Sequence, residues 1–145
     1  MERNIQLLRA RHALAKVRDA AGSKGMVDEY LSAARGLPAE IRMNGLGQAI
    51  AMLRARGVKN DGAMALYRHV SDWMCRHGSP SPYGGKEHPE EALLDAIVHE
   101  PEHDYRQAYV EIDAYLAWLK RFADALLEKP KEGAKPKSGE KGESA

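Results

Sequence analysis

The sequence predicts an all-α protein, a compact bundle of about six helices with a disordered C-terminal tail. Alanine and leucine supply 36 of its 145 residues, whereas valine and isoleucine supply 11 and threonine is absent. Alanine and leucine favour helices and β-branched residues favour strands, so this composition gives strands little support. Apolar residues also recur every three or four positions along most of the chain, which is the spacing of one helix face.

The first predicted helix covers residues 4–21 and ends at a glycine-containing break over residues 22–25. One side of this helix is apolar and carries Leu7, Ala10, Leu14, Val17 and Ala21. Charged residues seven positions apart share a face two turns along the helix, as Arg9 does with Lys16 and Arg11 with Arg18. We therefore expect the apolar side to face the core and these cations to lie away from it.

A second, shorter helix is predicted over residues 26–35. Gly36 is a suitable C-terminal stop, and Pro38 suits the first turn of a third helix that continues to residue 56. Gly45 and Gly47 fall inside this third helix, where each costs up to about 1 kcal/mol relative to alanine. We expect another backbone to approach closely at these two glycines.

The fourth predicted helix covers residues 62–77, and Asn60 or Asp61 serves as its N-cap. A loop over residues 78–88 follows, and its proline and glycine content indicates that residues 83–86 form a mobile tip.

Prolines set the boundaries of the last two predicted helices. Pro89 begins the fifth helix, and Pro101 ends it. The sixth covers residues 104–128 and, at 1.5 Å per residue, is about 37 Å long.

Length and composition indicate one helical domain over residues 1–128 and a tail over residues 129–145. The tail is rich in Lys, Glu, Gly and Pro and has almost no apolar content, so we expect it to be disordered. No apolar run is long enough to span a membrane and no secretory signal is visible. The single cysteine, Cys75, favours a reducing compartment, and the expected location is the cytoplasm.

The charge is distributed unevenly, although the net charge of the whole chain is only +1. Residues 1–60 carry 11 Lys/Arg and 5 Asp/Glu, a net charge of +6. Residues 61–128 carry 6 Lys/Arg and 13 Asp/Glu, a net charge of −7. A basic half of this kind favours a polyanion partner, and the two halves also favour head-to-tail packing of copies. Alternatively, both sets of charges are solvated helix faces.

The basic half supplies the candidate residues for binding a nucleic-acid backbone. Arginine offers phosphate a planar set of donors and stays charged at every relevant pH. The candidates are Arg42, Arg54, Arg56, Arg11, Arg18, Arg9 and Lys16. We expect these side chains to converge into one continuous strip that follows a nucleic-acid backbone without reading bases.

No catalytic residue, metal ligand or cofactor site is predicted. Residues 99–103 match the zinc-protease pattern H-E-x-x-H, but Pro101 lies between His99 and His103 and breaks the helix that the motif requires. The other histidines form no ligand cluster, and no phosphate-binding glycine loop occurs. A small metallohydrolase built on His99 and His103 is therefore only an alternative, which metal analysis would test.

Two segments resemble the small helical subunit of Cmr-type (type III-B) CRISPR RNA-guided effector complexes. The first, residues 37–51, reads LPAEIRMNGLGQAIA and resembles the family pattern L-P-x-x-I-x-x-N-G-L-x-Q. The second, residues 104–123, carries the pieces YRQAYVE and WLKRFA of the family's C-terminal helix. The resemblance covers residues 5–127, and neither segment is a catalytic motif.

The resemblance implies a non-catalytic structural subunit that stacks in several copies along the guide–target RNA duplex. Its implied partners are other subunits of the effector complex, copies of itself, guide RNA and target RNA. Arg42 lies within the first segment and is the first choice for a phosphate contact. The sequence does not separate this family from the small subunit of type III-A complexes. A helical protein–protein adaptor without nucleic-acid binding is the alternative function.

Overall fold

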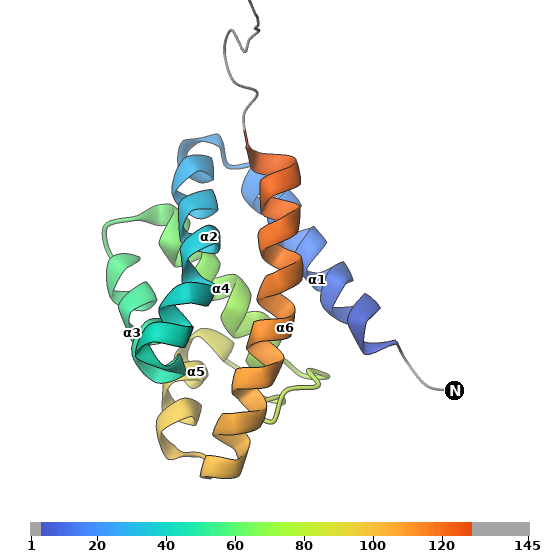
Figure 1. Ribbon diagram of the computed structural model, residues 1–145, viewed down its shortest axis with the longest axis vertical. Coiled ribbons are helices and arrows are strands. Elements are labelled where there is room, and N and C mark those ends of the chain that lie inside the picture. Colours follow the sequence, from blue (N-terminus) through green and yellow to red (C-terminus); the bar gives the residue numbers. More distant parts are fainter. Residues whose placement is uncertain (1–3, 129–145) are drawn as a thin grey trace, which may run out of the picture.

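The computed structural model describes residues 4–128, which form six α-helices, one short 3-10 turn and no strand (Figure 1). The elements are α1 (Ile5–Ala21), η1 (Lys24–Met26), α2 (Val27–Asn44), α3 (Leu46–Arg56), α4 (Asp61–Cys75), α5 (Pro89–His99) and α6 (Glu102–Leu127). The predicted all-α class and the number of helices are confirmed. The predicted tail lies outside the described residues. No helix among residues 4–128 is both long and apolar enough to cross a membrane.

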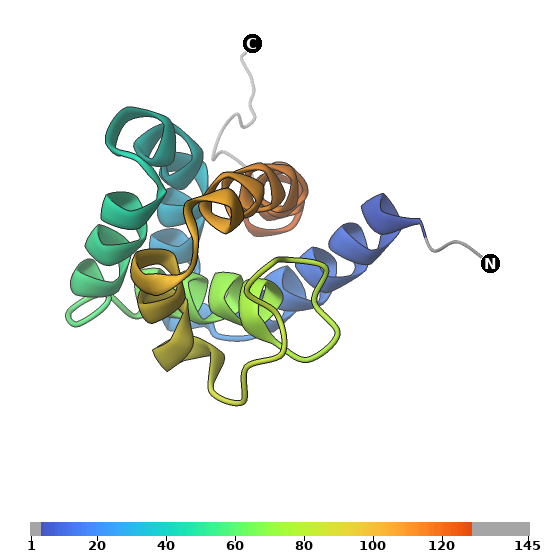
Figure 2. The ribbon, with the colours of Figure 1, turned by 90° about the horizontal axis from the view of Figure 1, so that it is seen from below.

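Helix α4 runs through the middle of the bundle, with the other helices around it (Figure 2). Ten of its fifteen residues are buried, including Leu66, Val70 and Met74. Its N-terminus is capped by Asn60, whose side chain accepts a hydrogen bond from the backbone N–H of Ala63 at 2.7 Å. The adjacent Gly62 lies directly against the backbone of α2, where a Cβ atom would collide with Glu29 and Tyr30. The core is therefore centred on α4, and α2 packs on its first turn.

The predicted helix boundary at Gly36 and Pro38 is wrong, because α2 continues through both residues. A proline inside a helix costs about 3 kcal/mol. Burial of Leu37 and Ile41 on either side of it offsets this cost, since each buried aliphatic side chain contributes about 1.5–3 kcal/mol. The helix ends instead at Gly45, whose φ of +86° strongly favours glycine.

The close approach of another backbone predicted at Gly45 and Gly47 is not observed, but the side chain of a neighbouring helix does approach Gly47 closely. A Cβ atom on Gly47 would lie 3.3 Å from Cγ2 of Ile97, so α5 packs closely against the start of α3. Gly45, by contrast, is the break between α2 and α3. Just after this break, the hydroxyl of Tyr105 accepts hydrogen bonds from the backbone N–H groups of Leu46 and Gly47. The two glycines therefore have different roles, one in chain direction and one in packing.

The apolar side predicted for the first helix is only partly the buried side of α1. The buried residues of α1 are His12, Ala13, Val17 and Ala20, whereas Leu7 is 46% exposed. α1 packs mainly on α6, and its N-terminal half projects beyond the rest of the bundle (Figures 1 and 2). The surface that α1 covers includes polar groups of α4 and α6, and polar residues of α1 form hydrogen bonds with them.

The predicted loop over residues 78–88 is present, but its predicted mobile tip is anchored to the bundle. The side chain of Tyr83 is completely buried. The backbone N–H groups of Gly85 and Lys86 donate to the carbonyl oxygens of Arg76 and Cys75, at 2.9 and 2.7 Å. The loop is therefore held against the C-terminus of α4, and the prediction from glycine content failed because it ignored the buried tyrosine.

Candidate nucleic-acid interface

Arg11 and Arg18 lie together on the outer face of α1. Both side chains are exposed, and neither has an acidic partner among residues 4–128. Seven residues separate them, so they lie about 10 Å apart along the same side of the helix. This pair has the exposure and the unshared charge that a phosphate contact requires.

Arg9 lies on the opposite, inner face of α1 and is bound to an acidic residue of α6. Its Nε and Nη2 atoms donate to the two carboxylate oxygens of Glu111, both at 2.8 Å. Glu111 is buried and also accepts a hydrogen bond from Nε1 of Trp73 at 2.9 Å. The hydrogen bond to Glu111 raises the pKa of Arg9. Arg9 therefore fastens α1 to α4 and α6, and its guanidinium is not available to a phosphate.

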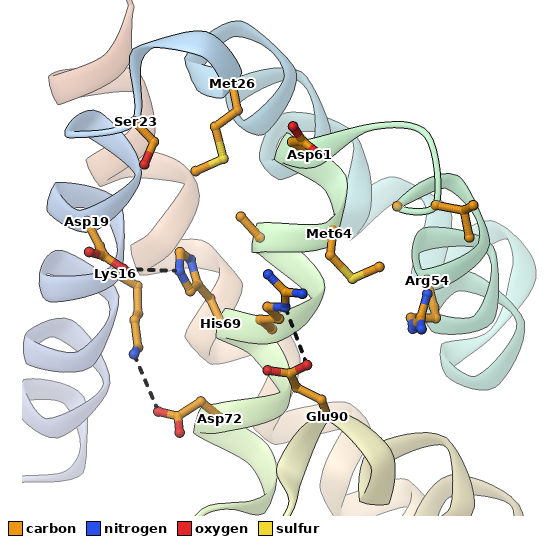
Figure 3. Close-up of a pocket in the computed structure, with 14 residues that line it drawn as sticks. Lys16, Asp19, Ser23, Met26, Arg54, Asp61, Met64, His69, Asp72 and Glu90 are labelled. Carbon is orange, nitrogen blue, oxygen red and sulfur yellow. Dashed lines mark hydrogen bonds and ion pairs between the residues drawn. The ribbon is translucent and has the colours of Figure 1, made fainter.

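Lys16 and Arg54 face a hollow of 770 Å³ between α1, α3, α4 and α5 (Figure 3). Nζ of Lys16 lies 3.8 Å from Oδ2 of Asp72, and the guanidinium of Arg54 lies 5.8 Å from the centre of the Tyr67 ring. The same hollow is lined by four acidic side chains, those of Asp19, Asp61, Asp72 and Glu90. Because its charges are mixed and largely paired, the hollow is a poor receptor for a polyanion.

Two buried histidines lie in this region, and each bridges a tyrosine and an aspartate. Nδ1 of His12 is 2.7 Å from the hydroxyl of Tyr115, and its Nε2 is 2.7 Å from Oδ2 of Asp72. A carboxylate only accepts, so Nε2 carries the proton and the tyrosine hydroxyl donates to Nδ1. Burial lowers the pKa of His12.

His69 repeats the arrangement with different partners. Its Nδ1 is 2.7 Å from the hydroxyl of Tyr30, and its Nε2 is 3.9 Å from Oδ2 of Asp19. Burial lowers the pKa of His69 to about 4, so its ring is neutral at neutral pH. A chain of Asp, His and Tyr could serve general base catalysis, but the side chains of Tyr30 and Tyr115 are completely buried and meet no solvent. Both sets therefore hold helices together.

Arg42 and Arg56 have acidic partners but remain at the surface. Nη1 of Arg42 lies 3.8 Å from Oδ1 of Asp113, and Nη2 of Arg56 donates to Oε1 of Glu40 at 3.2 Å. Exposed ion pairs contribute only about 0–1 kcal/mol, so a polyanion would compete with them readily. Arg42 also shares a hollow of 350 Å³ with Lys120 and Arg121, which have no acidic partner among residues 4–128.

The expected single strip of seven cations is therefore not what the fold forms. Arg11 and Arg18 share one exposed face, and Lys16 and Arg54 share one hollow. Arg9, Arg42 and Arg56 each lie elsewhere. Arg76 was not among the predicted candidates. It lies at the end of α4, lines the same small hollow as Arg11 and has no acidic partner within residues 4–128. Nothing in its sequence context identifies it, because its neighbour belongs to a different helix.

The H-E-x-x-H segment lies across the junction between two helices. α5 ends at His99, α6 begins at Glu102, and Pro101 lies between them, as predicted. The side chains of His99 and His103 are exposed and are near Asp95 and Asp104 respectively. Residues 4–128 contain no group of three His, Cys, Asp or Glu side chains that could hold a metal ion.

Fold and surface together define a small all-helical protein with paired charges inside and unshared arginines on a projecting helix. The chain belongs to the Cmr5 family, since its residues 5–126 match the family described as CRISPR-associated protein (Cas_Cmr5).

A curated protein and a solved structure, both from Thermus thermophilus, support this assignment. The chain is 32% identical over 126 residues to the CRISPR system Cmr subunit Cmr5 of that organism, and the match covers 82% of this chain and 92% of the relative. The crystal structure of a CRISPR-associated Cmr5 family protein superposes with a TM-score of 0.72 at 30% identity, covering 88% of this chain and all of the other. The predicted resemblance to the Cmr-type small subunit is confirmed.

Proposed function

We propose that this protein is a non-catalytic structural subunit of a type III-B CRISPR effector complex and that it contacts the RNA backbone. The observation that carries the proposal is the pair Arg11 and Arg18, which present unshared charge on one exposed helix face. A helix with such a face follows phosphates without reading bases. The family assignment supplies the complex, and the projecting half of α1 supplies a surface that neighbouring molecules can reach.

A second RNA contact is proposed at Arg42, together with Lys120 and Arg121. Arg42 is 60% exposed and is held only by a 3.8 Å ion pair, so a phosphate would displace Asp113 at small cost. Arg54, Arg56 and Lys16 take a lesser part, since each already has a partner. Arg9 supports the interface indirectly by fixing the direction of α1.

The proposal includes several copies stacked along the guide–target duplex. The net charges of +6 on residues 1–60 and −7 on residues 61–128 favour contact between the basic part of one copy and the acidic part of the next. The proposed location of the protein is the cytoplasm.

A salt series on the assembled complex tests the RNA contact. The double variant Arg11→Glu with Arg18→Glu removes two phosphate contacts per copy. We expect the slope of log affinity against log salt to fall by about 1.4–1.8 for each copy bound, since each contact contributes about 0.7 on a single strand and 0.9 on a duplex. Filter binding of the target RNA between low and physiological salt measures this slope.

Arg68→Glu is the control, because Arg68 is an exposed cation of α4 that lines the mixed-charge hollow. It should leave the slope unchanged. Equal slopes for the wild type and the double variant, in complexes of equal composition, would rule out the proposed contact. If no complex contained RNA, the wild type included, while the protein contacts stayed intact, the result would instead match a protein–protein adaptor.

A further inference from the structure

Two hollows lie on either side of Pro80, where the loop after α4 passes between α1 and α6. One, of 280 Å³, is lined by Leu8, Arg11, His12, Trp73, Arg76, Gly78 and Pro80. The other, of 420 Å³, is lined by Pro80, Pro82, His103, Arg106, Gln107, Val110 and Glu111. We call the two hollows and the shared Pro80 the Pro80 groove.

The walls of the Pro80 groove are held in place by buried interactions. The bidentate contact between Arg9 and Glu111, with Trp73 as third member, ties α1, α4 and α6 together beside the groove. Tyr83 anchors the loop in the core. A preformed surface of this kind loses little conformational entropy when a ligand binds.

The charge of the Pro80 groove is positive and is not shared with acidic side chains. Arg11 and Arg76 have no acidic partner among residues 4–128. Arg106 has only an exposed pair with Glu102, one turn away, at 3.3 Å. Glu111 is the one acidic side chain among the residues that line the two hollows, and Arg9 already neutralises it.

Apolar side chains line the groove together with these arginines. Leu8, Pro80 and Pro82 line the groove, and Val110 on α6 is 67% exposed. Together with Leu8 and the two prolines, Val110 forms an apolar surface on which a partner's apolar side chains can pack.

We infer that the Pro80 groove binds an extended, acidic segment of a partner protein whose leucine-like side chains alternate with carboxylates. The carboxylates pair with Arg76 and Arg106, which leaves Arg11 to the proposed RNA contact, and the apolar side chains pack on Leu8, Pro80 and Val110. The chain's own residues 129–145 do not fit this description, since their 5 Lys and 3 Glu carry a net charge of +2.

An RNA strand fits the groove less well than an acidic peptide. Sequence-independent binding of single strands combines cations with exposed aromatic rings on which bases stack. The aromatic rings of Trp73 and His12, which line the smaller hollow, are buried. The larger hollow is lined by no Trp, Tyr or Phe, and the exposed imidazole of His103 is its one aromatic ring. The inference goes beyond the proposed function and does not depend on RNA binding by Arg18, which lies outside the residues that line the groove.

Fluorescence anisotropy with the full chain tests the inference. The probe is a fluorescein-labelled peptide in which leucines alternate with glutamates and aspartates, and the control peptide replaces each acid with lysine. We expect the acidic peptide to bind and the lysine peptide not to bind. Arg76→Glu and Val110→Asp should each weaken binding of the acidic peptide about tenfold or more, as for a charged or apolar anchor at an interface centre.

Arg18→Glu is the matched control, because it makes the same charge change on α1 outside the groove. It should lower RNA binding by the complex and leave peptide binding unchanged, which separates failure of the groove from failure of the proposed function. Wild-type affinity in both groove variants, equal binding of the two peptides, or no binding of the acidic peptide would overturn the inference. Loss of RNA binding but not peptide binding in Val110→Asp would mark the groove as an RNA surface and would also overturn it.

Discussion

The two faces of α1 carry similar basic residues and use them in opposite ways. On the inner face, Arg9, His12 and Lys16 each lie beside a carboxylate of α4 or α6, at 2.7–3.8 Å. On the outer face, Arg11 and Arg18 have no acidic partner within residues 4–128. The type of residue therefore does not separate a structural cation from a candidate binding cation. What separates them is whether the fold brings an acid against the side chain.

The largest expected effect concerns the inner face. Glu111→Ala leaves Arg9 and Nε1 of Trp73 without their partner in a largely buried place. Removing one member of a buried ion pair costs about 3–5 kcal/mol. Urea denaturation should show this loss, whereas Asp113→Ala, an exposed carboxylate on the same helix, should change the free energy of unfolding by less than about 0.5 kcal/mol. Equal losses of unfolding free energy in the two variants would show that the buried pair is no more important for stability than an exposed charge.

The next largest effect is a loss of folding stability in acid. It comes from the buried histidines His12 of α1 and His69 of α4. The pKa of His69 falls from 6.5 in the unfolded chain to about 4 in the fold, and burial also lowers the pKa of His12. Between these pH values the unfolded chain binds protons that the folded chain does not. Stability from His69 is therefore complete above pH 6.5 and decreases as the pH falls toward 4, by up to about 3 kcal/mol.

Unfolding free energies measured by urea denaturation at about pH 7 and about pH 4.5 check this prediction, since the two values lie on either side of the range in which the unfolded histidine gains its proton. His69→Gln should reduce the difference between the two pH values, while His103→Gln, an exposed histidine at the start of α6, should leave it as it is. A pH-independent stability in the wild type would show that the inner face does not exclude protons as the geometry indicates.

The smallest expected effect concerns two apolar residues of α1. The stability losses of their variants show which side of the helix is buried in solution. Val17 is completely buried, so Val17→Ala should cost about 2 kcal/mol. Leu7 is nearly half exposed, and Leu7→Ala should cost less than about 1 kcal/mol. Thermal unfolding of the two variants tests the order. The reverse order would mean that α1 is rotated about its axis relative to the structure.

Much of the helix pattern followed from local features of the chain. Asn60 caps α4, Pro89 begins α5, and Pro101 separates α5 from α6, because each feature acts on backbone groups within one turn. Pro38 misled the prediction for the same reason. Its local effect is unfavourable, but the buried residues around it belong to contacts with α4 and α6, which local reasoning does not include.

The candidate site depended far more on distant contacts. The family resemblance was visible in residues 37–51 and 104–123, and Arg11 and Arg18 could be placed together by helical spacing alone. That Arg9 would be neutralised, unlike Arg11 and Arg18, could not be predicted, because its partner Glu111 is 102 positions away in the chain. The position of Arg76 in the Pro80 groove could not be predicted for a similar reason, since α1 and α4 meet only in the folded protein.

Composition and spacing were enough to specify six helices, their main caps and the separation of charge into a basic and an acidic half. These properties arise from interactions within a few residues, so they can be predicted without knowledge of the fold. Packing alone chose the buried side of α1 and determined which arginines were neutralised. Side-chain burial and charge pairing act through space, and only the folded chain sets which distant residues become neighbours.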